Sequence, residues 1–247
     1  MIIPAAGAGS RLGASVPKVL VPVAGRPMID RLLGLYAGTA FRFTIVASPL
    51  GRDLLEAHLA RTGASVEIVV QPEPTGMLDA ILLVRDHVLR SEPDRVWITW
   101  CDQLAVHPGT IARLAEADTA GAEMVFPTCR VRTPYIHLER DGIGRIVAVR
   151  HRREGDPMPE FGESDIGLFS LSRDAYLRDL PAFEGAGGRG AATQERNFLP
   201  FIPWLSARRR VATFPCADPV EAVGINTPED LRRIERHFQE AGTDRAR

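Results

Sequence analysis

The sequence predicts an α/β protein with a mixed, mainly parallel sheet and helices on both faces. Two observations support this fold class. Short apolar runs alternate with segments of helical apolar spacing at intervals of about 20–30 residues, as in doubly wound sheets. Small or polar residues that are suited to ligand binding follow three of these runs, at Gly7, Gln71 and Asp102. Ligands of parallel sheets bind at the carboxyl ends of the strands, so these positions are expected to share one edge.

The first half of the chain is expected to alternate regularly between strands and helices. Apolar runs bounded by turn residues predict buried strands at 1–5, 43–47, 66–70, 95–100 and 124–128. Apolar residues at helical spacing predict helices at 28–36, 53–62, 76–89 and 107–119. Pro27 and Pro108 stand at the start of two of these helices, where proline is tolerated.

The second half is predicted to be less regular. Two alternating segments around the glycine-containing turn 141–144 predict a hairpin over 135–150. Thr227 and Pro228 predict the N-cap and the first turn of a last helix. The glycine-rich stretch 185–190 is expected to be either a lid or disordered. The other expected elements are a polar loop at 152–163, strands at 165–171 and 210–214, and helices at 173–180 and 198–205.

The composition excludes several classes of protein. The 30 basic and 31 acidic residues give a net charge of −1, which does not support a nucleic-acid binder that relies on positive charge. No apolar run approaches the roughly 18 residues that a membrane-spanning helix needs. The three cysteines are far apart, as expected for reduced thiols, and the N-terminus lacks the basic segment of a signal peptide. We therefore expect a cytoplasmic protein with no nucleic-acid or membrane partner, and the sequence leaves its oligomeric state open.

The segment after the first predicted strand is expected to bind an anion. Its small side chains let backbone N–H groups approach phosphate oxygens, and Arg11 and Lys18 supply positive charge. A solvated loop cation is the alternative interpretation of either residue. The candidate cradle consists of Pro4, Ala5, Ala6, Gly7, Ala8, Gly9, Ser10 and Arg11.

Asp102 ends an apolar strand and is expected to need a cationic partner. A carboxylate that is buried without a partner is costly, and a metal ion or a basic side chain removes that cost. The alternative interpretation is a helix N-cap or a turn residue.

Five segments resemble the sugar-1-phosphate nucleotidyltransferases, a family of NTP transferases. The opening segments 3–12 (IPAAGAGSRL) and 17–29 (PKVLVPVAGRPMI) are similar to the N-terminal motif of that family. Segment 71–80 resembles the second nucleotide segment, 97–103 the strand with the metal aspartate, and 221–231 the segment with the second metal ligand. The chain most resembles the uridyltransferase domain of bifunctional N-acetylglucosamine-1-phosphate uridyltransferases, and to a lesser degree the thymidylyltransferases.

This resemblance implies a Rossmann-like, glycosyltransferase-A-type fold and a Mg²⁺-dependent reaction. In the family, a sugar 1-phosphate attacks the α-phosphate of a nucleoside triphosphate and pyrophosphate leaves. The resemblance implies a single nucleotidyltransferase domain over 1–247, with a nucleotide-binding half at 1–130, an acceptor-binding half at 131–225 and a C-terminal helix at 226–247. No hexapeptide repeat follows Asn226, so we expect no acetyltransferase activity from this sequence.

The resemblance also implies roles for charged and metal-binding residues. Arg11 would bind the β- and γ-phosphates, and Lys18 would bind the α-phosphate and align the attacking phosphate. Asp102 and Asn226 would be the protein ligands of Mg²⁺, with phosphates and water completing the octahedron. Asn226 has an alternative role as the cap of the helix that follows Thr227.

The base of the nucleotide is expected to meet the segment after the third strand. The amide of Gln71 offers both a donor and an acceptor to a base edge, and Gly76 lets a backbone come close. The resemblance implies a pyrimidine next to Gln71, Gly76 and Met77. A polar strand end is the alternative interpretation of Gln71.

The expected acceptor side departs from the uridyltransferases. Four substitutions stand out: Ile136 for a Gly, Arg150 for a Glu, Asp165 for an Asn, and Cys101 for the Gly before the metal aspartate. The residues expected to bind the acceptor are Ile136, Arg150, Arg152, Asp165 and Glu195. Of these, Arg152 would bind the acceptor phosphate and Glu195 a sugar hydroxyl. The basic run 150–153 has an alternative interpretation as a solvated surface.

Three functions therefore remain open from the sequence. The first is transfer of a uridylyl or thymidylyl group to a sugar 1-phosphate, which the motifs around Gln71, Asp102 and Asn226 favour. The second is cytidylyl transfer to a non-sugar phosphate or phosphonate, which Ile136 and Asp165 favour. The third is a non-catalytic nucleotide-binding relative, supported only by the altered acceptor side.

Overall fold

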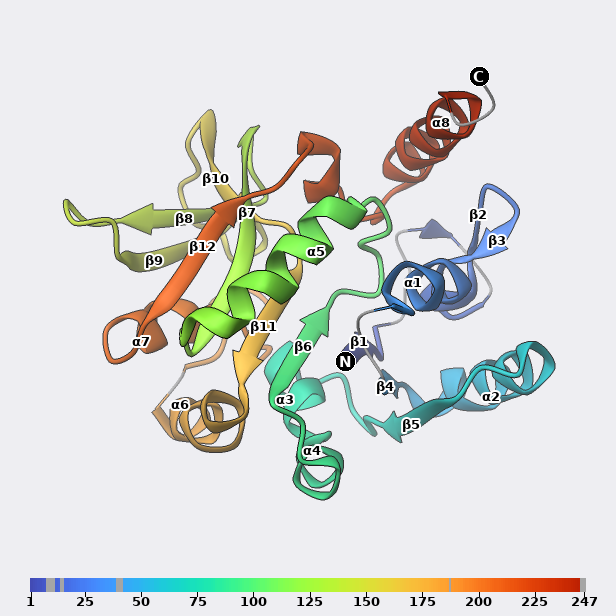
Figure 1. Ribbon diagram of the computed structural model, residues 1–247, viewed down its shortest axis with the longest axis horizontal. Coiled ribbons are helices and arrows are strands. Elements are labelled where there is room, and N and C mark those ends of the chain that lie inside the picture. Colours follow the sequence, from blue (N-terminus) through green and yellow to red (C-terminus); the bar gives the residue numbers. More distant parts are fainter. Residues whose placement is uncertain (8–11, 14–15, 39–41, 187, 245–247) are drawn as a thin grey trace.

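An eight-stranded sheet forms the centre of the computed structural model, which describes residues 1–244 except 8–11, 14–15, 39–41 and 187 (Figure 1). Seven strands follow the order β10-β7-β11-β6-β1-β4-β5, and β12 also pairs with β7. The strands are β1 (Ile2–Ala5), β4 (Phe43–Ala47), β5 (Val66–Val70), β6 (Arg95–Thr99), β7 (Met124–Arg132), β10 (Phe161–Asp165), β11 (Leu168–Ser172) and β12 (Val211–Pro215).

The direction of the strands makes the sheet mixed. Strands β6, β1, β4 and β5 run parallel to one another, and β12 runs parallel to β7. Strands β10 and β11 are antiparallel to their neighbours. The predicted mixed, mainly parallel sheet is therefore confirmed.

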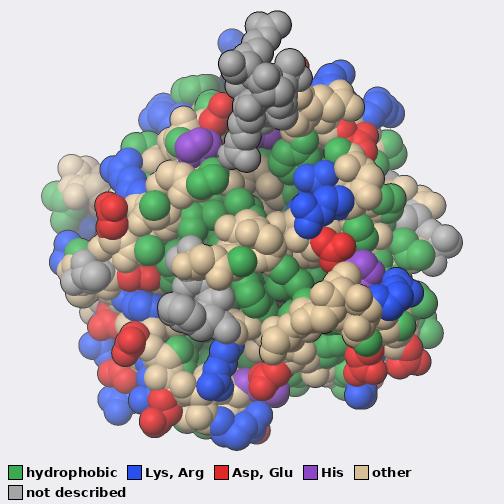
Figure 2. Space-filling model, turned by 45° about the vertical axis from the view of Figure 1, so that its right-hand side comes forward, with side chains coloured by type: hydrophobic (Ala, Val, Ile, Leu, Met, Phe, Trp, Pro, Cys, Tyr) green, Lys and Arg blue, Asp and Glu red, His purple; other side chains and the backbone are tan. Residues whose placement is uncertain are grey.

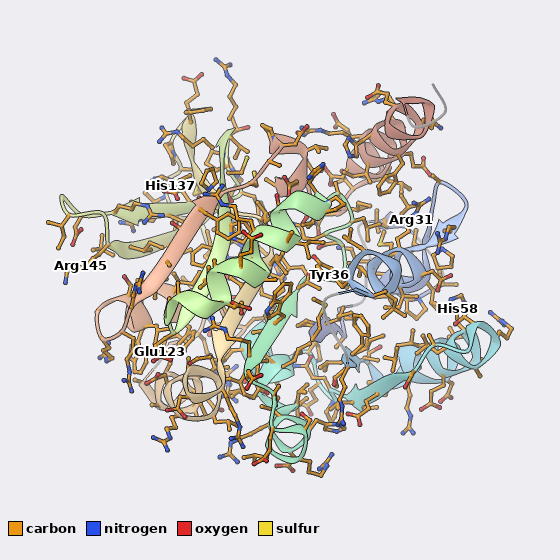
Figure 3. All side chains as sticks on the ribbon, in the orientation of Figure 1. Arg31, Tyr36, His58, Glu123, His137 and Arg145 are labelled. Carbon is orange, nitrogen blue, oxygen red and sulfur yellow. The ribbon has the colours of Figure 1, made fainter. Side chains whose placement is uncertain are left out.

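Helices cover both faces of this sheet, as predicted. They are α1 (Met28–Tyr36), α2 (Pro49–Thr62), α3 (Met77–Leu82), α4 (Arg85–Ser91), α5 (Pro108–Ala117), α6 (Leu180–Ala186), α7 (Phe201–Ser206) and α8 (Pro228–Asp244). Buried residues of α1, α2, α5 and α8 belong to one apolar cluster, and those of α3, α4, α6 and α7 belong to a second. The hydroxyl of Tyr36, at the end of α1, reaches the sheet and lies 3.4 Å from Thr99 Oγ1 (Figure 3).

The alternation of side chains along the strands explains the two clusters. Successive residues of a strand point to opposite faces. Ile3, Ile45 and Trp97 accordingly belong to the first cluster, whereas their neighbours Ile2 and Val46 belong to the second. Apolar residues are needed on both faces, so these strands appear in the sequence as continuous apolar runs.

Two small hairpins and several short helices complete the fold. Strands β2 (Pro22–Val23) and β3 (Arg26–Pro27) form one hairpin, and β8 (Ile136–Arg140) and β9 (Ile146–His151) form the other. Short 3₁₀ helices span Lys18–Leu20, Asp118–Ala120, Arg152–Glu154 and Pro219–Ala222, and a π-helix spans Ala175–Asp179. Helix α8 lies beside β2 (Figure 1), where Arg31 stacks on Phe238 at 4.4 Å.

Several predicted elements are confirmed and others are corrected. Helix α1 and strands β4 and β5 have the expected bounds. The predicted helix 76–89 is divided into α3 and α4, because the backbone tightens at Val84, whose N–H donates to Ile81 O. The predicted strand 165–171 is divided by a turn at Gly167, and the end of the predicted loop 152–163 is already strand β10. Strand β7 continues past Thr128 because β10 pairs with its second half.

None of the helices in the described part of the chain combines the length and the apolarity needed to cross a bilayer. Basic and acidic side chains are interspersed on the face shown in Figure 2, without a large region of one sign.

The parallel strands place the predicted site segments at one edge. Ala6 and Gly7 follow β1, Gln71 follows β5, and Trp100 to Asp102 follow β6. Because these strands run parallel, their carboxyl ends lie on the same side of the sheet.

Candidate functional site

Lys18, Asp102 and Asn226 come together beyond the carboxyl end of β6. The Lys18 ammonium donates to Asp102 Oδ2 at 2.5 Å and to Asn226 Oδ1 at 3.1 Å. Asp102 is 8% exposed, so its carboxylate depends on this cation for compensation. The expectation that Asp102 has a cationic partner is confirmed, and within the protein that partner is Lys18.

The segment before α8 brings Asn226 to Asp102. The backbone N–H of Ile225 donates to Asp102 O at 3.2 Å. A Cβ on Gly224 would lie 3.3 Å from Asp102 Oδ1, so the absence of a side chain allows this close packing. Gly224 was not expected in the site, and an isolated glycine in a loop offers no signal that would have identified it.

Asn226 does not cap α8. The cap is made by Thr227, whose Oγ1 accepts from Asp230 N at 3.2 Å, while Asp230 Oδ2 accepts from Thr227 N at 2.8 Å. The side-chain oxygen of Asn226 faces Lys18 instead. The alternative interpretation of Asn226 as the helix cap is therefore wrong.

Glu221 anchors the segment that carries Asn226. It is fully buried and accepts hydrogen bonds from His107 N at 3.0 Å, Thr110 Oγ1 at 3.1 Å and Asp218 N at 2.8 Å. These contacts tie the start of α5 to the 3₁₀ helix Pro219–Ala222. Glu221 was also missed, although the spacing of Asp218 and Glu221 is that of a capping box and was readable in the sequence.

The oxygens around Lys18 suit a magnesium ion. One carboxylate oxygen and one amide oxygen already converge on a single cation, the Lys18 ammonium. Mg²⁺ prefers such oxygen ligands and takes only one or two from protein when phosphates are present. Among the described residues, no group of three His, Cys, Asp or Glu side chains could enclose a metal. Asp102 and Asn226 therefore fit a metal shared with a phosphorylated substrate.

Cys101, which precedes Asp102, has an unreactive thiol. Burial raises the pKa of its thiol to about 12, and the nearby Lys18 lowers it only in part. The side chain is therefore a neutral thiol at physiological pH.

Gln71 is buried and fixed by its amide nitrogen. It is 5% exposed, and Nε2 donates to Gly76 O at 3.1 Å. The orientation of the amide follows from this bond, because a carbonyl can only accept. Contact of Gln71 with a base stays a prediction, because this local bond also fits a polar strand end.

The backbone of Arg196 packs closely against Gly76, whereas the expected approach of Gly76 to a base stays a prediction. Gly76 has a φ of 133°, and a Cβ there would lie 2.4 Å from both Arg196 N and Arg196 O. Two backbone bonds fix this contact: Arg196 N donates to Thr75 O at 2.8 Å, and Leu78 N donates to Arg196 O at 3.0 Å. A cavity of about 430 Å³ opens beside this contact, lined in part by Gln71, Asp79, Glu184 and Arg196.

The predicted phosphate cradle is described only in part. Pro4 and Ala5 belong to β1, and Ala6 and Gly7 follow it. Among the described residues, no atom lies within 4 Å of a Cβ built on Gly7. Ala8, Gly9, Ser10 and Arg11 lie outside the described residues, and their roles stay predictions.

Most predicted acceptor residues pair with near neighbours. Ile136 is 8% exposed and packs in the second apolar cluster. Arg150 forms a two-point ion pair with Glu139, at 2.8 and 3.1 Å. Arg152 donates to Pro134 O at 3.1 Å. Their contact with an acceptor stays a prediction.

Two more pairs involve the segment after the glycine-rich stretch. Glu195 binds Arg153 through both guanidinium nitrogens, at 3.1 and 3.0 Å. Gly190 N donates to Glu195 O at 2.9 Å, so the end of the stretch 185–190 forms a bonded turn. Gly187 lies outside the described residues, and Gly185 belongs to α6.

Asp165 has an unusual environment. Its Oδ1 accepts from Gly167 N at 2.8 Å, in the turn between β10 and β11, but Oδ2 is buried without a hydrogen-bond partner. Burial raises the pKa of this carboxyl to about 6. Gln103 Oε1 is a second buried oxygen without a partner. Trp100 N donates to Gly167 O at 2.9 Å, so this turn adjoins the segment that leads to Asp102.

The raised pKa predicts that Asp165→Asn stabilises the protein at alkaline pH. The unfolded carboxyl ionises near pH 3.8, but the folded one retains its proton to about pH 6. The wild type should therefore lose stability as the pH rises between these values, by up to about 3 kcal/mol for a shift of this size. Urea unfolding of both proteins at pH 4 and pH 8 measures this. If Asp165→Asn changes the free energy of unfolding equally at pH 4 and at pH 8, the buried charge is not the cause of the change.

Comparisons with known proteins identify similar sequences over most of the chain. The sequence profile of the MobA-like NTP transferase domain matches residues 1–196. The bifunctional protein GlmU of Pelotomaculum thermopropionicum is 27% identical over 244 residues, which cover 96% of this chain and 51% of that protein. The GlmU of Thermus thermophilus is 30% identical over 242 residues, covering 95% and 50%. The chain thus spans about half the length of these curated relatives.

Solved structures share the fold. A putative glucose-1-phosphate thymidylyltransferase from Bacillus anthracis superposes with a TM-score of 0.75 at 16% identity, covering 95% of this chain and 93% of that one. The inositol-1-phosphate CTP transferase of T. maritima gives a TM-score of 0.70 at 19% identity, covering 95% and 92%. At these identities the likeness concerns the fold alone.

Proposed function

Because the chain belongs to the MobA-like NTP transferase domain family, we propose that it transfers a nucleotidyl group from a nucleoside triphosphate to a phosphorylated small molecule. The favoured reaction joins UTP or dTTP to a sugar 1-phosphate and releases pyrophosphate. The observation that carries the proposal is the convergence of Lys18, Asp102 and Asn226 at the carboxyl edge of the sheet.

The chemistry asks the protein mainly to position and neutralise phosphates. An acceptor phosphate oxygen forms a bond to the α-phosphorus, and the bond from that phosphorus to the bridging oxygen of the pyrophosphate breaks. Lys18, whose ammonium is held by Asp102, would bind the α-phosphate and align the attacking phosphate. Asp102 and Asn226 would hold Mg²⁺, which supplies further neutralisation of the triphosphate when bound.

Gln71 would offer an acceptor atom to the nucleotide base. Its Nε2 donates to Gly76 O at 3.1 Å and to Thr75 Oγ1 at 3.4 Å, so Oε1 is the atom that remains for a ligand. Uracil and thymine carry a donor at N3, whereas cytosine has an acceptor at N3 and a donor at N4. Oε1 facing N3 would therefore favour UTP or dTTP, and Oε1 facing the exocyclic group at C4 would favour CTP.

A second candidate function is cytidylyl transfer to a non-sugar phosphate or phosphonate. Asp165 favours it, because an ionised carboxylate with an unpartnered oxygen stands where the uridyltransferases carry a neutral Asn. Such a group suits an acceptor other than the usual sugar.

One panel of substrates tests both candidates. Pyrophosphate release would be measured with the four ribonucleoside triphosphates and dTTP, each with several sugar 1-phosphates and several non-sugar phosphates, in the presence of Mg²⁺. We expect turnover with UTP or dTTP and a sugar 1-phosphate. A preference for CTP with a non-sugar acceptor would favour the second candidate, and no turnover with any pair would exclude both.

A further inference from the structure

Glu154 holds a segment of chain that is distant in sequence. It lies in the 3₁₀ helix Arg152–Glu154, directly after β9. Its Oε2 accepts from Ala192 N at 2.9 Å and Thr193 N at 3.1 Å, and its Oε1 accepts from Thr193 Oγ1 at 2.6 Å and Asn197 Nδ2 at 3.0 Å. Burial opposes the charge, but these bonds together lower the pKa of Glu154 to about 2. The carboxylate is therefore ionised and accepts these bonds at neutral pH.

The packing around Glu154 is close. A Cβ on Gly190 would lie 2.4 Å from Glu154 Oε1, so only glycine fits there without a shift. The neighbouring Arg153 adds its two-point ion pair with Glu195. The segment 190–197 is thus fixed to the end of the β8–β9 hairpin by a cluster of charge-assisted bonds, which are stronger than neutral ones.

The same segment is fixed to the nucleotide side through Arg196. Its backbone N–H donates to Thr75 O, and its backbone C=O accepts from Leu78 N. Both bonds lie beside Gly76, whose lack of a side chain leaves room for this contact. Its guanidinium lies 2.8 Å from Asp79 Oδ1 and 2.6 Å from Glu184 Oε1. Asn197, the next residue, is one of the donors to Glu154.

A continuous chain of contacts therefore runs from the β8–β9 hairpin to Gln71. Glu154 binds Asn197, Arg196 is held against Gly76, and Gly76 O fixes the amide of Gln71. None of these contacts involves the metal-binding residues, so this chain is separate from the site around Asp102.

We propose that Glu154 is a positioning residue for base recognition: through the segment 190–197 it fixes Gly76, and through Gly76 it sets the amide of Gln71. This inference rests on the proposed function, because it assigns Gln71 to the nucleotide base. Although Glu154 follows the acceptor-side hairpin, it acts on affinity and selectivity for the nucleotide.

Steady-state kinetics of Glu154→Ala and Glu154→Gln test this inference. We expect Glu154→Ala to raise the KM for the preferred nucleotide by about five- to tenfold, as for loss of several bonds to a charged acceptor, with little change in kcat. Selectivity between UTP or dTTP and CTP should fall by a similar factor. The KM of Glu154→Gln for the nucleotide should lie between those of the wild type and Glu154→Ala, because the amide oxygen of Gln can still accept some of the bonds.

Asp141→Ala is a matched control. Asp141 is another hairpin carboxylate with several bonds, but its partners are Ile143 and Arg145 in its own turn, at the hairpin tip where Figure 3 labels Arg145. This variant should leave the KM for the nucleotide unchanged. A Glu154→Ala variant that alters only the KM for the acceptor would overturn the inference.

Hydrogen exchange separates this inference from the proposed function. The amides of Leu78 and Arg196 donate across the Gly76 contact, so Glu154→Ala should speed their exchange while that of the β4–β5 core stays unchanged. This holds even if no substrate pair is turned over. Unchanged exchange at both amides would overturn the positioning role, whereas faster exchange without turnover would count only against the proposed function.

Discussion

Asp102→Ala is expected to lower kcat by at least about a thousandfold while the fold survives. Removing one preorganised electrostatic group at a reacting centre typically costs two to three orders of magnitude. Asp102 is expected to serve twice, because it fixes the Lys18 ammonium and supplies the charged oxygen of the Mg²⁺ site. The fold should survive because the backbone of residue 102 still accepts from Ile225 N.

The measurement is pyrophosphate release at saturating substrates, with thermal unfolding as the check on the fold. Asp94→Ala is a suitable control, because Asp94 is exposed and lies just before the opposite end of the same strand, β6. Retained turnover in Asp102→Ala would contradict the assignment of Asp102. Tight nucleotide binding that needs neither Mg²⁺ nor Asp102, without turnover in the wild type, would instead favour a non-catalytic nucleotide-binding protein.

Gly76→Ala is expected to destabilise the protein by about 2–4 kcal/mol, the range for a strained residue in a fully packed position. The new Cβ would lie 2.4 Å from Arg196 N and O, which are backbone atoms held by two hydrogen bonds. The φ of 133° adds strain, since residues with a side chain rarely adopt it. Relief of this strain would require Arg196 to move away from Gly76, the residue whose carbonyl oxygen fixes the amide of Gln71.

Urea unfolding of Gly76→Ala and Gly142→Ala measures this effect. Gly142 lies in the β8–β9 turn, and a Cβ there would meet no atom within 4 Å. Its substitution should change stability by no more than about 0.5 kcal/mol, as for most exposed sites. Equal stability of the two variants would contradict the close approach of Arg196 to Gly76.

The sequence was most informative where one local pattern determines both structure and chemistry. The apolar runs at β1 and β4 are buried on both faces, so hydrophobicity alone predicted their bounds to within one residue. The meeting of Lys18, Asp102 and Asn226 could be expected because each belongs to a distinct motif. Of the three, only Asp102 is positioned directly by a parallel strand, whereas the bond of Ile225 N to Asp102 O brings Asn226 to it.

Other features depend on contacts that local patterns do not contain. The apolar spacing of 76–89 continues across Val84, so it gave no sign of the break between α3 and α4. The turn at Gly167 was readable in principle, since Asp165 and Gly167 are common turn residues. The contacts of Glu154 with Ala192, Thr193 and Asn197 join segments about 40 residues apart, and only the folded chain reveals them.

The wide separation of the site residues along the chain also has a consequence for the order of folding. Lys18 is 84 residues from Asp102 and 208 residues from Asn226. Contacts between such distant segments form late, because a long loop must close before they contribute. The paired strands β1 and β6 are closer in sequence than Lys18 and Asn226. We therefore expect the sheet to form before Asn226 reaches Lys18 and Asp102, so that a refolding chain regains its strands before its complete cation site. Ligands that require this site would then stabilise only the completely folded chain.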